Sequence, residues 1–430
     1  MKTVLIVCPR FPPASAADHQ RVRMMLPTLE ACGWKAVVLA VEAEFVEAPL
    51  EPDLLLTIPD SIEIIRCPAI PQRLTRRFRF GSLTLRSLSS LRTAGDRLLG
   101  SRQFDLVFFS TTEFGIIPLG RRWKRRFGIP FVVDLQDPWV NSHYSETGRT
   151  PPGGRFKHWL TQSVAESQER NTLVAAAHII SVSPQYPKDL SKRHPGLSPH
   201  SFSVIPFGGS SRDYEVMEET EQRQSIIPRG DDRRHWLYAG TAPPGIRRTV
   251  LGLLAALKQA ERSGVVGENE ICLHFVGTDY AAAALARPKI LALAREAGME
   301  SAVREHPSRI PYLQTLRCLK DADAVLILGW DDAGYTASKL YPYILAERPL
   351  LCVIHEESSA NDVMRRTGAG VTVSFNGRST EEDIAADIFE RWFVTRAFET
   401  TRQVSSIAFR PYTAESMTER VAEVFDRVVA

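Results

Sequence analysis

Short apolar runs alternate along this chain with segments in which apolar residues recur every three or four positions. The runs have the length and continuous apolar character of buried strands. The intervening spacing, as in Val22, Met25, Leu26 and Leu29, predicts helices. The chain is therefore expected to be an α/β protein with parallel sheets. The predicted strands lie at 4–8, 36–41, 105–110, 129–134, 178–183, 235–240, 271–277, 324–328 and 350–354.

One stretch carries the clearest candidate chemistry. Residues 334–349 lie between two strand-like runs, so the loop before the predicted helix is expected at the carboxyl edge of a sheet, where α/β folds bind ligands. Thr336 and Ser338 are residue types that cap helices, and Lys339 falls in the first turn, where the helix dipole disfavours a cation. A bound phosphate would resolve that conflict. The alternative is a surface lysine beside an ordinary cap.

The same stretch resembles a known family. Ser338-Lys-Leu-Tyr-x-Tyr-Ile-Leu-Ala-x-x-Pro-Leu-Leu351 looks like the donor-site helix of GT-B type glycosyltransferases, close to retaining family 4. The resemblance implies two Rossmann-like domains facing each other across a cleft, with a C-terminal helix that returns to the first domain. At 430 residues two domains are also expected from length alone. We place the acceptor domain at 1–207, the nucleotide-sugar domain at 208–410 and the returning helix at 411–430.

The resemblance also implies site residues. Lys339 and Arg247 would stabilise the departing diphosphate, and Asp137, after the strand at 129–134, would position or partly deprotonate the acceptor. An Asp-Pro turn without chemistry is the alternative for Asp137, and helix-start arginines in solvent are the alternative for the Arg247 pair. The expected donor-binding residues are Gly240, Thr241, Arg248, Arg309, Ile310, Thr336, Ser338, Tyr341 and Tyr343.

The sequence departs from the family pattern at three places. Pro342 and Gly334 stand where relatives carry a glutamate pair that recognises the donor, so Tyr341, Tyr343 or the backbone would have to hold the ribose. Ala14-Ser-Ala-Ala17 stands where the family often has a glycine pair, with Arg21 and Arg23 as substitute sources of charge. Ordinary helix-surface positions are the alternative for both arginines.

Composition restricts the remaining possibilities. Six scattered cysteines without Cys-x-x-Cys indicate free thiols in a reducing compartment, and neither a metal nor another cofactor is expected; His274 is expected to be a core histidine. No apolar run approaches the ~20 residues of a membrane span. We therefore expect a cytoplasmic protein. The arginine-rich region 66–126, interleaved with leucines, could contact an anionic membrane at its inner face, or could be a solvated face packed on its leucines. Nucleic acid is not expected.

The expected function is glycosyl transfer, such as hexosyl transfer in polysaccharide biosynthesis. The partners would be a nucleotide-sugar donor and a glycan or lipid-linked acceptor, and the reaction is expected to retain configuration without metal. Two alternatives stay open. One is a degenerate GT-B-fold binding or assembly protein, suggested by the altered donor helix. The other is a sugar-nucleotide epimerase, for which the sequence offers no identifiable acid/base pair.

Overall fold

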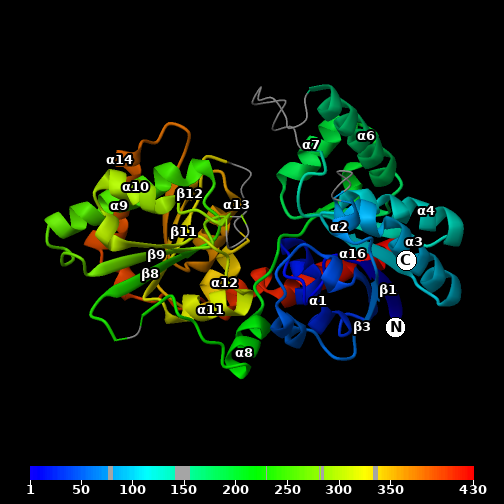
Figure 1. The fold of residues 1–430 in the computed structure, drawn as a ribbon, viewed down its shortest axis with the longest axis horizontal. Helices are drawn as coiled ribbons and strands as arrows, with labels where there is room; N and C mark the ends of the chain where they lie inside the picture. Colours follow the sequence, from blue (N-terminus) through cyan, green and yellow to red (C-terminus); the bar gives the residue numbers. More distant parts are fainter. Residues whose placement is uncertain (76–80, 141–154, 229, 280, 282–284, 333–337) are drawn as a thin grey trace. The chain divides into compact units, whose positions relative to one another are not determined.

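The computed structural model describes residues 1–75, 81–140, 155–228, 230–279, 281, 285–332 and 338–430, with 155–161 described by backbone alone. The chain divides into two compact units (Figure 1). Met1–Gly208 and Ala414–Ala430 form the first, called the N-terminal domain below, and Gly209–Thr413 form the second, called the C-terminal domain.

The N-terminal domain is built on a parallel sheet. Among its described residues, seven strands pair in the order β3-β2-β1-β4-β5-β6-β7. The order reverses between β1 and β4, which makes their carboxyl ends a topological switch point. The strands are β1 (Lys2–Val7), β2 (Trp34–Val41), β3 (Glu63–Cys67), β4 (Leu106–Ser110), β5 (Phe131–Leu135), β6 (His178–Ser181) and β7 (Phe202–Val204).

Helices connect these strands and cover the sheet. One buried cluster joins Leu5, Leu39 and Phe109 to Leu91 and Trp123 from two of the helices. Glycine allows close packing there, because a Cβ on Gly95 would lie 2.2 Å from the Trp123 ring. The helices are α1 (Gln20–Leu29), α2 (Gln72–Thr75), α3 (Leu83–Ser101), α4 (Pro118–Phe127), α6 (Arg155–Leu173) and α7 (Gln185–Arg193).

The last helix, α16 (Ala414–Val429), belongs to the N-terminal domain although it follows the second domain in sequence. Its buried face joins the core formed by Val4, Ile6 and Phe108. The Phe425 ring lies edge-on to Trp34 and Phe108, at centroid distances of 5.3 and 5.0 Å. The predicted return of the terminal helix to the first domain is therefore confirmed.

The C-terminal domain repeats the same architecture. Six strands of its described residues pair in parallel in the order β10-β9-β8-β11-β12-β13, and the order reverses between β8 and β11. The strands are β8 (Arg234–Ala239), β9 (Ile271–Val276), β10 (Val303–His306), β11 (Ala324–Leu328), β12 (Leu350–His355) and β13 (Val371–Phe375). The main helices are α8 (Ser211–Glu219), α9 (Arg247–Arg262), α10 (Ile290–Ala297), α11 (Tyr312–Asp321), α12 (Leu340–Leu345), α13 (Ser359–Thr367) and α14 (Glu381–Ile388), with the short α15 at Ser406–Phe409.

Two parallel, doubly wound sheets confirm the predicted pair of Rossmann-like domains. Within the described part of the chain, no helix is both long enough and apolar enough for a bilayer crossing.

The region 66–126 does not present its leucines to solvent as a continuous face. Leu83, Leu91, Leu98 and Leu99 are buried, whereas Leu85 is exposed. Arg86 is also buried, and its guanidinium donates to the carbonyls of Ile70 and Phe45. Most of the leucines that a lipid-facing surface would need are therefore part of the core.

Candidate functional sites

The first candidate site lies at the carboxyl end of β8 in the C-terminal domain. The strand ends at Ala239, and Gly240 follows with φ +149°, a conformation that side chains rarely adopt. A Cβ at Gly240 would stand 2.8 Å from the Lys339 ammonium. A side chain at Gly240 would therefore crowd the Lys339 amine at the end of the strand.

Lys339 contacts an aromatic ring and a hydroxyl. Its Nζ donates to the Tyr238 hydroxyl at 3.0 Å and lies 4.1 Å from the centroid of the same ring. Tyr238 in turn donates to the Thr241 carbonyl at 2.7 Å. Among the described residues no carboxylate pairs with this ammonium, and the neighbouring sequence 333–337 contains no acid. The Lys339 amine therefore has no counter-charge among the described residues.

This environment changes the protonation of Lys339. Burial of the ammonium lowers its pKa to about 7, because water no longer solvates the charged form. The residue as a whole is partly exposed, so the desolvation acts at the end of the side chain. A bound anion would favour the charged form and raise the pKa again.

The helix after Lys339 differs from the sequence prediction. It spans only Leu340–Leu345, and Lys339 itself occupies the N-cap position without a side-chain cap bond. Ser338 is exposed and precedes that cap, so the expected capping role of Ser338 is wrong. Thr336 and Gly334 lie outside the described residues.

The two tyrosines of α12 are buried and help to shape the site. Tyr343 accepts from the Ala239 N–H at 2.7 Å and donates to the Ala239 carbonyl at 3.0 Å. Its hydroxyl therefore fixes the end of β8, which revises the expected ribose contact. The Tyr341 ring packs parallel to Tyr412, with centroids 6.2 Å apart.

The two predicted arginines are engaged elsewhere. Arg247, the first residue of α9, is exposed and forms a two-pronged ion pair with Glu296 of α10, one contact at 2.8 Å. Arg248 donates to the Ser379 carbonyl at 3.0 Å and pairs with Asp331 at 3.2 Å. The structure thus gathers Gly240, Tyr343 and Lys339 and leaves both guanidiniums with other partners. A diphosphate role for Arg247 stays a prediction that requires it to leave Glu296.

Arg309 and Ile310 follow β10 and precede α11. The Arg309 Cα would lie 3.8 Å from a Cβ on Gly277, which follows β9 and has φ +72°. The pair thus lies along the same edge of the sheet as Gly240, next to the turn after β9. Arg309 is exposed and Ile310 half-buried, so both stay candidates for contact with a base.

A buried polar network lies at the carboxyl ends of β4 and β5 in the N-terminal domain. Arg21 Nε donates to Asp134 Oδ2 at 2.8 Å, and both side chains are fully buried. Ser110 and Gln136 also donate to that oxygen, at 2.8 and 2.9 Å. Arg23 is buried too and donates to Thr57 at 3.0 Å. The expectation that Arg21 and Arg23 supply charge to the donor is therefore wrong, since internal partners hold them.

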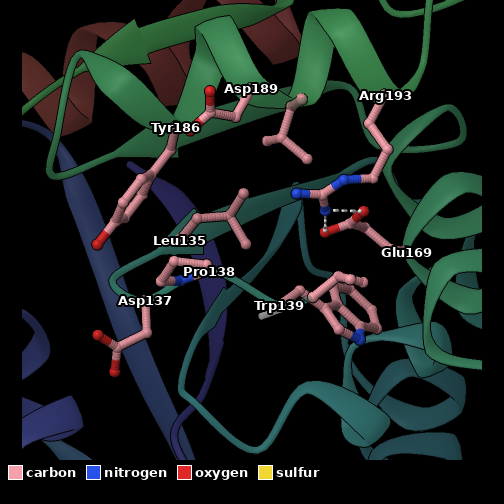
Figure 2. A pocket seen from close by; sticks show the side chains of 10 residues that line it. Leu135, Asp137, Pro138, Trp139, Glu169, Tyr186, Asp189 and Arg193 are labelled. Atoms are coloured by element: carbon pink, nitrogen blue, oxygen red, sulfur yellow. Dashed lines mark hydrogen bonds and ion pairs between the residues drawn. The ribbon is translucent and has the colours of Figure 1, made fainter. Parts of the chain in front are cut away.

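Asp137 lies at the rim of a pocket in the N-terminal domain, two residues beyond β5 (Figure 2). Figure 2 shows Asp137 and Tyr186 on one side of the pocket and an ion pair on the other. In that pair, Arg193 Nη1 lies 2.7 Å from Glu169 Oε2. The Asp137 side chain is exposed, yet its pKa is raised, chiefly by desolvation and further by Asp18. A carboxylate with raised proton affinity suits an acceptor hydroxyl.

Sequence reasoning missed several residues that these sites use. Tyr238 was only a strand residue in an apolar run, and Asp134 ended another. Nothing local distinguishes them, because their partners Lys339 and Arg21 lie far away in sequence. Glu169 and Tyr186 are likewise brought to Asp137 only by α6 and α7.

The sequence comparison finds a likeness for most of the first domain. Residues 19–208 match the family described as glycosyl transferase 4-like domain. No curated protein sequence matches the chain.

Solved structures extend the likeness over both domains. HepE from Anabaena, in complex with UDP and glucose, superposes with a TM-score of 0.62 at 14% identity, covering 99% of this chain and 100% of that one. WaaG, a glycosyltransferase involved in lipopolysaccharide biosynthesis, gives 0.58 at 15% identity, with 98% and 99% covered. A putative UDP-N-acetylglucosamine 2-epimerase from Listeria monocytogenes gives 0.54 at 11% identity, with 98% and 95% covered.

These likenesses establish the fold. Together with the family match over residues 19–208, they confirm the resemblance to GT-B glycosyltransferases inferred from the sequence. The epimerase shares the same fold, so fold alone does not separate transfer from epimerisation.

Proposed function

We propose that the protein is a glycosyltransferase that moves a sugar from a nucleotide-diphosphate sugar to an acceptor hydroxyl. The observation that carries the proposal is the Lys339 ammonium, which lies at a sheet switch point without an acidic partner among the described residues. A diphosphate would supply the missing negative charge. UDP is the first nucleotide to test, since HepE, of the same fold, was solved with it.

We propose a reaction that uses the charge at this site and the retaining course that the family resemblance implies. The bond between the anomeric carbon and the diphosphate oxygen breaks, and the acceptor oxygen forms the new bond to that carbon. Lys339 stabilises the charge that develops on the leaving diphosphate. The leaving phosphate takes the acceptor proton on the same face, which retains configuration. Because a side-chain ammonium supplies the positive charge, we propose that transfer needs no metal ion.

Asp137 is the proposed acceptor-positioning residue. Its pocket is lined by the aromatic rings of Trp139 and Tyr186. Acidic residues in the lining outnumber the basic ones, and its arginine, Arg193, already forms an ion pair with Glu169. Such a surface suits a neutral, hydroxyl-rich acceptor such as a glycan, with stacking on rings and hydrogen bonds to carboxylates. We propose that any lipid part of a lipid-linked acceptor lies outside this pocket.

Contact with an anionic membrane is proposed for α4 alone. Arg121, Lys124, Arg125 and Arg126 are exposed there. Asp96 neutralises Arg126, at 2.6 Å, whereas Lys124 donates to the Ala175 carbonyl at 2.9 Å. The contact would be electrostatic and would weaken with salt, since buried leucines supply no apolar anchor.

A thermal-shift screen against UDP, GDP, ADP and dTDP, with and without magnesium, tests donor binding. Selective stabilisation by one base, unchanged by magnesium, is expected, because a ligand of the native state raises its apparent stability. Release of the nucleotide from the matching sugar conjugate, with and without glycan acceptors, then tests transfer. If the protein instead forms an epimerised sugar nucleotide when no acceptor is present, the proposed activity would be epimerisation and not transfer.

One observation favours a second candidate function, that of a nucleotide-binding protein without turnover. Pro342 stands in α12 where the family resemblance places a ribose-binding glutamate, and its carbonyl already accepts from Tyr214 at 2.6 Å. Binding of a nucleotide sugar without transfer to any acceptor would support this reading.

A further inference from the structure

A cluster of potential metal ligands lies on the C-terminal domain sheet, away from the proposed donor site. His235 is the second residue of β8, and Cys272 and His274 belong to β9. All three side chains are buried. One potential ligand atom from each lies within 4.8 Å of the other two. Imidazole and thiolate are the ligands that Zn²⁺ prefers.

Strand register explains why the three side chains meet. The parallel strands β8 and β9 place His235 opposite Cys272, and His274 follows Cys272 by two residues on the same face. Trp236, Leu273 and Phe275 alternate with them and belong to the apolar core of the domain. The cluster is therefore fixed by the backbone of two central strands.

The two histidines are already oriented for a shared ion. His235 Nδ1 and His274 Nε2 face each other at 2.9 Å, so one proton joins them. Tetrahedral zinc with Zn–N bonds of about 2.0–2.1 Å holds two nitrogens roughly 3.4 Å apart. The rings need to separate by only about half an ångström to admit the metal.

The surroundings include an outer partner of the kind that metal-bound histidines use. His235 Nε2 lies 2.6 Å from Asp231 Oδ1, which leaves Nδ1 as the nitrogen free to bind. His274 Nδ1 is buried with no hydrogen-bond partner among the described residues, so its ring can carry the proton there when a metal takes Nε2. The half-exposed Asp231 also places the cluster near solvent, from which an ion can enter.

We propose that His235, Cys272 and His274 bind one Zn²⁺ ion, with Asp231 as the hydrogen-bond partner of His235. The Cys272 thiolate and the Asp231 carboxylate would balance the two positive charges. The described residues supply three protein ligands, so a water molecule would complete the tetrahedron. This proposal departs from the sequence expectation of no metal, because ligands on two different strands leave no spacing motif beyond Cys272-Leu-His274.

The ion would have a structural role. His235 precedes Gly240 by five residues, so about 16 Å of strand separates it from the Lys339 site. It would cross-link β8 and β9 near their amino ends, opposite the carboxyl ends that carry the proposed donor site. Zinc should therefore stabilise the domain without taking part in transfer.

Cobalt titration of metal-free, reduced protein tests the site. Wild type should bind one Co²⁺ per chain with a near-ultraviolet thiolate-to-cobalt absorption band, and Zn²⁺ should displace it and raise the Tm. Cys272→Ala should lose the band. Cys67→Ala, which removes another buried strand cysteine, should keep it.

Asp231→Asn provides a test that does not depend on a core substitution. Asp231 is partly exposed, so the variant should fold, and the loss of its support should weaken Co²⁺ binding about 10–100-fold. Absence of the band in wild type, or its persistence in Cys272→Ala, would overturn the proposal. UDP binding by the metal-free protein is a separate readout, and it should be unchanged whichever way the cobalt result falls.

Discussion

Each domain carries a basic side chain at the carboxyl edge of its sheet, but only one of the two has an internal counter-charge. In the N-terminal domain, Arg21 is paired with Asp134 inside the protein, at 2.8 Å. In the C-terminal domain, the Lys339 amine contacts the ring and hydroxyl of Tyr238 and has no carboxylate partner among the described residues. A cation with an internal counter-charge supports the fold, whereas a desolvated cation without one favours an external anion. From this difference we infer that Arg21 stabilises the fold and that Lys339 binds a ligand.

The largest effect is expected from breaking the internal pair. Arg21→Met leaves the Asp134 carboxylate buried without its counter-charge, which should cost about 3–5 kcal/mol in unfolding free energy. Urea unfolding followed by circular dichroism measures it. Arg102→Met, which breaks an exposed 2.7 Å pair with Glu63 in the same domain, should cost under about 1 kcal/mol. If the two variants lose the same unfolding free energy, Arg21 does not have the structural role inferred here.

The Asp137→Asn variant tests whether the N-terminal domain, in which Arg21 has a structural role, also carries the acceptor site. Loss of a positioned carboxylate at the acceptor should lower the rate of sugar transfer about 100-fold or more. UDP affinity should not change, because Asp137 belongs to the other domain from Lys339. Steady-state transfer assays and calorimetric UDP titration measure the two quantities. Asp189→Asn, in the same pocket, is the matched control and should reduce transfer less. Transfer unaffected by Asp137→Asn would leave Asp137 as an ordinary turn residue.

Lys339→Met should act on binding and not on folding. Removing a charge-assisted contact to phosphate costs about 1.5–3 kcal/mol, which weakens UDP binding about 10–100-fold. Thermal stability should stay equal or rise, since the buried ammonium is no longer present. Arg247→Met is the informative companion. It should also weaken UDP binding if Arg247 leaves Glu296 for the diphosphate, and should leave binding unchanged if it does not.

The remaining effect is a pH dependence of stability. Burial lowers the Lys339 pKa in the folded state to about 7, below its ordinary value, so the unfolded chain binds more protons above that pH. Lys339 should therefore make unfolding free energy rise with pH above about 7, by up to about 1.4 kcal/mol per pH unit. The difference between wild type and Lys339→Met isolates this slope. If the difference in unfolding free energy between the two proteins does not change from pH 7 to 9, the charge of Lys339 is not buried.

The fold was predictable because it depends on local pattern. Continuous apolar runs such as 324–328 and 350–354 became adjacent parallel strands, as expected. The site was predictable only where a single residue carried an electrostatic conflict, as Lys339 did. Sequence gave no signal for Tyr238, whose hydroxyl meets Lys339 across 101 positions, or for Asp134, which meets Arg21 across 113. It also placed the helix start too early, since capping residue types do not determine where α12 begins.

Proton uptake on UDP binding tests the central claim most directly. Calorimetric titrations at pH 8 in two buffers of different ionisation enthalpy give the number of protons taken up. Because burial lowers the Lys339 pKa to about 7, much of the side chain is neutral at pH 8 in the free protein, so an anion that restores its charge should bring about proton uptake. Lys339→Met should take up almost none. UDP binding by wild type with no proton uptake, or with the same uptake as the variant, would show that Lys339 is not the diphosphate ligand.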